Sequence, residues 1–301
     1  MQTIEFNGDH LSKLSLGTVQ FGLDYGIANS TGQPDIHDVK EIIDYVLENG
    51  INCFDTASAY GNSEEVLGKV LNKEKTSYII SKLSSDGFIY DLEGNVEQSL
   101  QRLQCKTLYG LLLHDSKLLP DWNTGFDNTV AALLASNKVK RFGISIYTES
   151  DFNKALENTS ITIIQIPFNI FDQRAINDKW FTRAKEANKL IFVRSVFLQG
   201  LFFMKSKQLT GNLVEAIPYL EEMHKIRSNL NLSITEFIMA YVNSVAIDAV
   251  ILFGCNTLKQ ARENVNSYHH LSTIDRATLD KVNAIFSDVP EHITNPVQWN
   301  S

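Results

Sequence analysis

Hydrophobic residues along the chain follow two spacings that alternate from the N-terminus to the C-terminus. Short runs rich in β-branched residues have the length and composition of buried strands. Between these runs, hydrophobic residues recur three and four positions apart, as they do over residues 39–47, where they share one face of a helix. Asp35 precedes this helical stretch as a suitable N-cap, and Gly50 follows it as a suitable stop.

The alternation predicts eight strands, each followed by a helical segment. The strands are expected at residues 13–17, 51–55, 78–82, 108–114, 140–145, 161–166, 190–195 and 249–252. The helices are expected near residues 39–47, 63–71, 96–103, 130–136, 149–157, 175–187, 214–241 and 258–265, with 214–241 divided into two. Because strands that alternate with helices form parallel βαβ units, eight such units close most simply into a barrel.

We therefore expect an α/β fold, a (β/α)8 TIM barrel, that occupies residues 1–301 as a single domain. An open doubly wound sheet is the alternative, but no G-x-G-x-x-G motif follows the first strand. Ahead of the barrel, residues 4–8 alternate in polarity and end in Asn7-Gly8, a strong hairpin signal. We expect this N-terminal β-hairpin to plug the bottom of the barrel.

Composition and charge narrow the range of functions. The chain has 301 residues, of which 44% are hydrophobic and 21% charged, as in a globular protein with a sizeable core. Its formal net charge of −8 argues against nucleic acid and anionic lipid as partners. The apolar runs are too short for a membrane span, and the N-terminus lacks a signal-peptide pattern, so we expect a cytoplasmic protein.

Neither the cysteines nor the histidines predict a metal site. The three cysteines, Cys53, Cys105 and Cys255, form no C-x-x-C pair, so free thiols in a reducing compartment are expected. The side chains of the adjacent pair His269-His270 point in different directions on most backbones, which disfavours joint metal binding.

The candidate chemistry lies where the predicted strands end. In a (β/α)8 barrel the active site is built at the C-terminal ends of the strands. Asp55, Lys82 and His114 each close a strand, and Tyr60 follows Asp55 by five residues. A lysine ammonium beside a phenol favours the phenolate, a carboxylate holds the lysine charged, and an imidazole can orient a carbonyl. The four side chains thus predict proton donation to a carbonyl oxygen as hydride arrives at its carbon.

Several ordered motifs carry a resemblance to a known family. They are residues 16–22 (LGTVQFG), 54–57 (FDTA), 60–64 (YGNSE), 80–82 (ISK), 111–114 (LLLH), 143–145 (GIS), Gln165 with Phe168-Asn169, Ser195 with Gln199-Gly200-Leu201, and 254–264. In these motifs, and over nearly the whole chain, the sequence resembles the aldo-keto reductase family.

The resemblance implies an NAD(P)H-dependent oxidoreductase that interconverts a carbonyl and an alcohol. It implies that Tyr60 is the general acid, that Lys82 and Asp55 tune it, and that His114 orients the carbonyl. The cofactor is expected to be NADPH, with NADH possible. The residues implied in cofactor binding are Gly17, Thr18, Asp55, Ser145, Gln165, Arg194, Ser195, Gln199, Gly200, Gly254, Lys259, Glu263 and Asn264.

The chain departs from the family pattern at three places. Ile146 stands where the family usually has an asparagine that contacts the cofactor amide, and Arg194 stands where an aromatic ring often stacks on the nicotinamide. Arg194 could stack on that ring, reach a cofactor phosphate or a substrate hydroxyl, or pair with a loop carboxylate. Near residues 254–260 only Lys259 and Arg262 are basic, which leaves few cations for a 2′-phosphate.

Two further functions remain open at this stage. One is a cofactor-binding regulatory or scaffold protein on the same fold, since fold alone does not determine function. The other is an unrelated barrel enzyme. The expected partner is a small-molecule carbonyl compound of unidentified structure, and the sequence does not indicate an oligomeric state. Trp122 and Trp299 either line the substrate pocket or pack at the surface.

Overall fold

The computed structural model describes residues 1–71 and 76–300, so residues 72–75 and 301 of the predicted domain lie outside it. The main sheet is a closed barrel of parallel strands in the order β10-β3-β4-β5-β6-β7-β8-β9. Its strands are β3 (Leu14–Gly17), β4 (Cys53–Asp55), β5 (Tyr78–Leu83), β6 (Leu108–Leu113), β7 (Val139–Ser145), β8 (Ile163–Pro167), β9 (Leu190–Arg194) and β10 (Val250–Gly254). The predicted (β/α)8 barrel is confirmed, with each strand end within two residues of the expected one.

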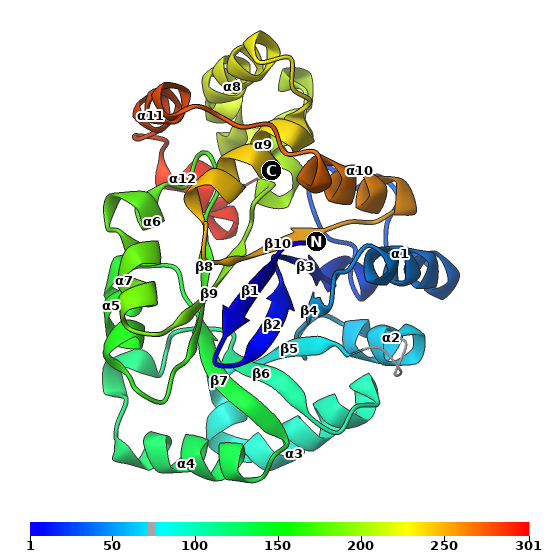
Figure 1. Cartoon of the computed structure of the whole chain (residues 1–301), viewed down its shortest axis with the longest axis vertical. Helices are drawn as coiled ribbons and strands as arrows, with labels where there is room; N and C mark the ends of the chain where they lie inside the picture. Colours follow the sequence, from blue (N-terminus) through cyan, green and yellow to red (C-terminus); the bar gives the residue numbers. More distant parts are fainter. Residues whose placement is uncertain (72–75, 301) are drawn as a thin grey trace.

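Helices surround the barrel on its outside (Figure 1). They are α1 (Ile36–Glu48), α2 (Ser63–Val70), α3 (Ser85–Leu103), α4 (Thr124–Ala135), α5 (Glu149–Glu157), α6 (Arg174–Asn177), α7 (Trp180–Glu186), α8 (Ile217–Asn229), α9 (Ile234–Val245), α10 (Leu258–His269), α11 (Arg276–Ile285) and α12 (Glu291–Thr294). The expected cap of α1 is present, because the Asp35 carboxylate accepts the backbone N–H groups of His37 and Asp38. Gly50 has a φ of +79°, as a helix stop requires.

The helices differ from the expectation in three respects. Helices α3 and α4 begin at Ser85 and Thr124, well before the expected residues 96 and 130. The single helix expected over 175–187 is divided into α6 and α7, because Lys179 adopts a φ of 55° in the left-handed region and breaks the hydrogen-bonding pattern. Trp180, which opens α7, is fully buried and stacks on Phe152 of α5. The hydrophobic spacing did not resolve α11 and α12.

The N-terminal hairpin lies across one end of the barrel (Figure 1). Strands β1 (Thr3–Phe6) and β2 (Asp9–Ser12) pair antiparallel, and both residues of the connecting turn, Asn7 and Gly8, have positive φ. Phe6 and Leu11 are buried in one cluster with the side chains that fill the barrel interior. The Asp9 carboxylate joins the hairpin to β7 through Lys140 and Arg141. The predicted hairpin is therefore present and packs on the interior of the barrel.

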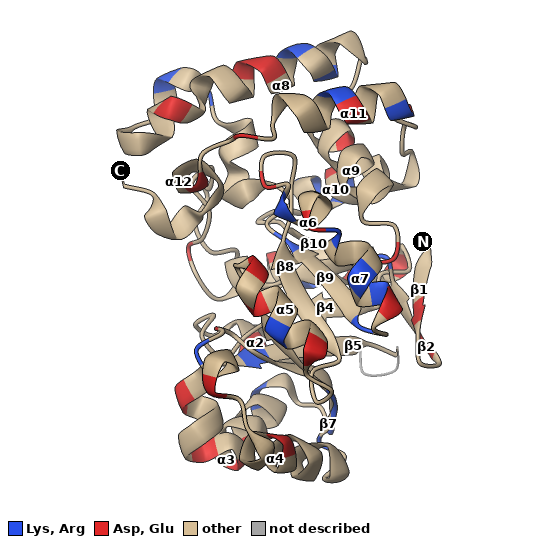
Figure 2. Ribbon diagram, turned by 90° about the vertical axis from the view of Figure 1, so that its left-hand side faces the viewer, with Lys and Arg blue, Asp and Glu red and all other residues tan. Residues whose placement is uncertain are grey.

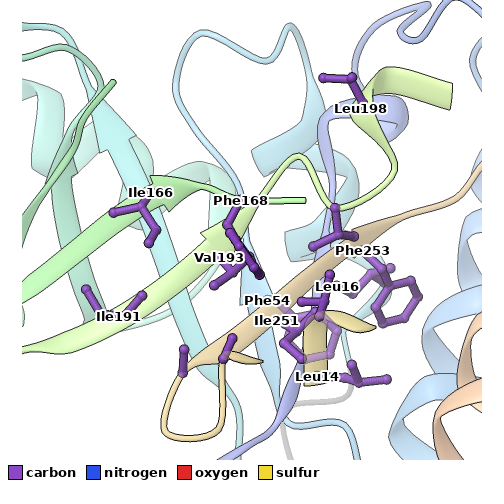
Figure 3. Close-up of a cluster of buried hydrophobic side chains, with 14 of the residues drawn as sticks. Leu14, Leu16, Phe54, Ile166, Phe168, Ile191, Val193, Leu198, Ile251 and Phe253 are labelled. Carbon is purple, nitrogen blue, oxygen red and sulfur yellow. The ribbon is translucent and has the colours of Figure 1, made fainter. Parts of the chain in front are cut away.

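The strands bury both of their faces. Side chains of one parity, such as Leu14, Leu16, Phe54 and Ile251, point outward and form the core between strands and helices (Figure 3). The other parity fills the barrel. Figure 2 shows the Lys, Arg, Asp and Glu residues spread over the outer helices. In the part of the chain that is described, no helix has the length and apolar character needed to cross a membrane.

If the hairpin completes the interior core, Leu11→Ala should lower the free energy of unfolding by about 2–4 kcal/mol, because a fully buried side chain leaves a cavity. Glu5→Ala, an exposed change in the same hairpin, should cost less than about 0.5 kcal/mol. Urea unfolding followed by circular dichroism measures both. Equal losses in the two variants would show that the hairpin does not act as a plug.

Candidate active site

The side chains predicted at the site share one strand parity. Cys53, Ile80, Leu112, Ile163 and Phe192 fill the barrel interior. Successive side chains of a strand point to opposite faces, so the residues two positions further along point the same way. Those residues are Asp55, Lys82, His114, Gln165 and Arg194. The alternation of the strands thus gathers them at the mouth of the barrel.

Asp55 and Lys82 form a buried ion pair. The Lys82 Nζ lies 2.5 Å from Asp55 Oδ1 and 2.8 Å from the carbonyl oxygen of Thr56, and its side chain is fully buried. The second carboxylate oxygen of Asp55 accepts a hydrogen bond of 2.8 Å from the Gln165 amide. Because both carboxylate oxygens are held, the position of the ammonium group is well determined.

Tyr60 and His114 lie beside this pair. The Lys82 Nζ is 3.5 Å from the Tyr60 hydroxyl oxygen, and the rings of Tyr60 and His114 meet edge to face with centroids 5.4 Å apart. The loop that carries Tyr60 packs closely on the loop after β3. A Cβ at Gly22 would stand 1.8 Å from the Tyr60 carbonyl oxygen, and one at Gly61 would stand 2.2 Å from the carbonyl oxygen of Gly22. These two glycines therefore allow the approach that places the phenol.

Burial and neighbouring charges together shift the pKa values of Lys82 and His114. Burial opposes the charge of Lys82, but the Asp55 carboxylate and the Tyr60 oxygen outweigh it, so the pKa of Lys82 is raised. Burial, together with the positive charges of Lys82 and Arg194, lowers the pKa of His114 to about 4. At neutral pH the site therefore holds an ammonium group beside a neutral imidazole.

A cavity of about 570 Å3 opens at this end of the barrel. Of the residues predicted at the site, those that line it are Gly17, Thr18, Asp55, Tyr60, His114, Ser145, Gln165, Arg194, Ser195, Gln199, Gly200, Gly254, Glu263 and Asn264. Lys82 lies buried behind Asp55 rather than in the wall. Lys259 is exposed and is not among the lining residues.

Other cavity residues were missed by the sequence reasoning. Gln20, Tyr25, Asn29 and Tyr147 line the cavity. Gln20 lies in a short 3-10 helix (Val19–Phe21) and the other three lie in loops, so no strand parity indicates where their side chains point. Gln20 packs over Gly254, and its Oε1 is buried without a hydrogen-bond partner among the described residues. Burial raises the pKa of Tyr25 to about 12, so this phenol is a hydrogen-bond donor at neutral pH.

The loop after β9 closes over the cavity in a strained conformation. Ser195, Leu198, Gln199 and Gly200 all have positive φ. A Cβ at Gly200 would stand 2.6 Å from the Cβ of Ala28, so only glycine allows this contact with the loop after β3. The two loops are also joined by a hydrogen bond of 3.0 Å from the Ile27 N–H to the Gln199 carbonyl oxygen. Strain of this kind is typical of ligand-binding segments.

Asn169 holds this strained loop from below. Together with Gln165, Phe168-Asn169 form one of the motifs that carry the family resemblance. In the structure, the Asn169 side chain is buried and donates a 3.1 Å hydrogen bond to the carbonyl oxygen of Ser195. Its own Oδ1 accepts the N–H groups of Phe171 and Asp172. Its contacts are thus with the backbone.

Arg194 contacts an aromatic ring and neutral oxygen atoms. Its guanidinium lies over the Tyr147 ring at 4.1 Å from the centroid. It donates hydrogen bonds of 3.2–3.3 Å to the hydroxyls of Ser145 and Ser195 and to the carbonyl oxygen of Ile146. The considered ion pair with a loop carboxylate does not occur among the described residues.

Trp122 and Trp299 are both partly buried and pack outside the cavity. Trp122 lies among Phe88, Phe126 and Phe142, and its indole N–H donates to Asp127. Trp299 donates its indole N–H to the carbonyl oxygen of Ile293. Neither is among the residues that line the cavity, so packing at the surface, and not pocket lining, agrees with the structure.

At the α10 end the described cavity lining is polar and carries no Lys or Arg. It includes Asn256, Gln260, Glu263 and Asn264, and the Glu263 carboxylate accepts a 2.8 Å hydrogen bond from the Thr235 hydroxyl. The Arg262 guanidinium lies over the Tyr45 ring of α1 instead.

Comparison with known proteins identifies the class. The sequence profile of the Aldo/keto reductase family matches residues 13–284. Because the match covers most of the chain, the protein belongs to the aldo/keto reductase family of oxidoreductases. Among curated proteins, the uncharacterized oxidoreductase YqkF of Bacillus subtilis is 23% identical to it, over 94% of each chain.

Solved structures share the fold. The holo form of aldo-keto reductase AKR11C1 from Bacillus halodurans gives a TM-score of 0.75 at 20% identity, over 94% of this chain and 95% of that one. An aldo-keto reductase from Klebsiella pneumoniae in complex with NADPH gives 0.71 at 16% identity, over 95% of each. At these identities the likeness concerns the barrel and its connections.

The lowered pKa of His114 has a measurable consequence. We expect its imidazole to titrate near pH 4 in an NMR titration, and to titrate at higher pH in the double variant Asp55→Asn/Lys82→Met, which removes one repelling charge without stranding its partner. In the unfolded chain the imidazole has a pKa of about 6.5. Between pH ~4 and ~6.5 the unfolded state therefore binds more protons than the folded state. Its contribution to the free energy of unfolding therefore falls as the pH drops from about 6.5 to about 4.

Lys69→Met provides the control, because Lys69 pairs with Glu65 on the exposed face of α2. It should leave the His114 titration unchanged. A wild-type His114 that titrates near its ordinary value would contradict the burial of its ring and the placement of Lys82 and Arg194 around it.

Proposed function

We propose that the protein reduces the carbonyl group of an aldehyde or ketone to an alcohol, or catalyses the reverse oxidation, with NAD(P)H as the hydride source. The observation that carries the proposal is the assembly of Tyr60, Lys82, Asp55 and His114 from separate loops and strands into one acid–base group at the cavity. A purely structural barrel has no need of a buried ion pair aimed at a phenol.

Features of the cavity support a dinucleotide cofactor. Gln20 offers a buried, unpartnered carbonyl oxygen that a ligand donor would satisfy. At Gly17 the nearest protein atom to an added Cβ is 3.5 Å away, so the protein itself leaves room that a ligand would use. We propose that Ser145 and Gln165 hold the amide end, the loop 195–200 the phosphates, and Glu263 with Asn264 the adenosine end.

When bound, the nicotinamide supplies the hydride that reaches the carbonyl carbon. The protein supplies the proton. Tyr60 donates its hydroxyl proton to the carbonyl oxygen, and the positive charge of Lys82 stabilises the phenolate that remains. Neutral His114 can donate an N–H to the same oxygen and orient it. Asp55 keeps Lys82 charged and in place. In the oxidation direction the Tyr60 phenolate takes the proton from the alcohol.

Tyr60→Phe tests this assignment. The variant should lose at least about 100-fold in kcat for reduction of a simple aldehyde, because it removes the proton donor. Its affinity for cofactor, measured by fluorescence titration, should stay close to the wild-type value. Tyr90→Phe, at an exposed position on α3, should match the wild type in both measurements.

Near wild-type turnover by Tyr60→Phe would remove this residue from the mechanism. A wild-type protein that binds cofactor but reduces no member of a broad aldehyde panel would instead favour the alternative, a cofactor-binding regulatory or scaffold protein.

The cation-poor α10 end predicts weak discrimination between NADPH and NADH. A charge-assisted phosphate contact contributes about 1.5–3 kcal/mol, or roughly 10- to 150-fold in affinity. With no lysine or arginine in the described lining there, we expect dissociation constants within about 10-fold of one another. Lys259→Gln should hardly change the ratio, since Lys259 points to solvent. An NADPH preference above about 100-fold would show that a cation does reach the 2′-phosphate.

A further inference from the structure

Near Tyr60 and His114, the described side chains that line the cavity carry an uncompensated positive charge. The described lining contains one cation, Arg194, and two carboxylates, Asp55 and Glu263. Asp55 is neutralised by Lys82, and Glu263 lies at the α10 end, on the Thr235 hydroxyl. Among the described residues Arg194 therefore has no counterion, and its side chain is partly withdrawn from water. Such a charge is costly unless an anion compensates it.

The Arg194 guanidinium is held in place, but its hydrogen-bond donors are not all used among the described residues. Its three hydrogen bonds run to neutral oxygens and are 3.2–3.3 Å long, beyond the usual optimum of about 2.9–3.0 Å. A guanidinium has five N–H donors, so two remain without a partner among the described residues. Stacking on Tyr147 fixes the plane of the group. A planar fork with free donors matches the geometry of a carboxylate.

Arg194 lies close to the reacting groups. It lines the same cavity as Tyr60 and His114. It ends β9 next to β8, and Gln165 of β8 donates its amide to the Asp55 carboxylate. Tyr25 and Tyr147 add hydroxyl groups to the same part of the wall. An anionic group bound by Arg194 would thus belong to the same ligand whose carbonyl group faces Tyr60.

We propose that the substrate is a carbonyl compound that also carries a carboxylate, and that Arg194 binds this carboxylate. The proposal rests on the proposed carbonyl reduction. It predicts selection for an anion over a neutral analogue of the same shape, whichever nicotinamide cofactor is used.

The test compares 4-carboxybenzaldehyde with methyl 4-formylbenzoate, which has the same ring and aldehyde without the charge. The wild type should favour the carboxylate by about 10- to 100-fold in kcat/KM, mainly through KM, the range for one charge-assisted contact. Arg194→Gln should bring the ratio close to one, whatever its effect on the dissociation constant of NADPH, because both aldehydes are compared with the same variant and the same cofactor. Arg194→Lys, which keeps the charge but loses the fork, should retain part of the preference.

Arg183→Gln is the matched control, because it removes an arginine that also lies over an aromatic ring, that of Phe152, outside the cavity. It should leave the substrate ratio as in the wild type. A wild-type ratio near one, or a ratio that Arg194→Gln does not change, overturns the proposal. So does a variant that loses NADPH affinity at an unchanged ratio, since Arg194 would then serve a cofactor phosphate.

Failure of the carbonyl reduction itself is recognised separately. If neither aldehyde is turned over, calorimetric titration of benzoate into the cofactor-saturated protein measures the anion site alone. Benzoate binding that Arg194→Gln abolishes and Arg183→Gln preserves supports a carboxylate site without the proposed reaction. No benzoate binding to the wild type overturns the site.

Discussion

Closure of the parallel barrel is the constraint on which the rest of the molecule depends. Strand β10 pairs with β3, with Gly254 beside Gly17, so the sheet has no free edge. In a closed barrel every inward side chain points at the same axis, and the inward parity of the strands ends in Asp55, Lys82, Gln165 and Arg194. Apolar members of that parity fill the interior below, where the hairpin completes the packing. The active site is thus the layer of inward-pointing side chains at the C-terminal ends of the strands.

The polar layer at the mouth of the barrel contains the buried ion pair of Asp55 and Lys82. Two charges removed from water are costly, and they are tolerated because Gln165 and the Thr56 carbonyl satisfy the remaining hydrogen bonds. The ammonium group then acts on its surroundings. It lies within 3.5 Å of the Tyr60 hydroxyl and contributes to the low pKa of His114. Together with burial, the ion pair therefore keeps the His114 imidazole neutral beside the reacting oxygen.

The cavity above this layer is shaped by loops whose contacts span large distances along the chain. Gly200 meets Ala28, Gly22 meets the Tyr60 loop, and Gln20 lies on Gly254. None of these contacts follows from a local pattern, since loops have no fixed periodicity. The glycine positions signal where backbones approach each other but not which partner they approach. For this reason Gln20, Tyr25 and Tyr147 were missed, while the strand-end residues were found.

The sequence by itself determined the alternation of strands and helices, the hairpin turn at Asn7-Gly8, and the identity of the polar residues that end the strands, because each depends on spacing within a short segment. It could not show that Lys179 breaks a helix, since no local signal marks its left-handed conformation. Nor could it show that Gln165 holds Asp55, that Asn169 supports the loop after β9, or that Arg194 stacks on Tyr147. Those contacts join residues from different strands and loops, and only the closed barrel brings them within reach of one another.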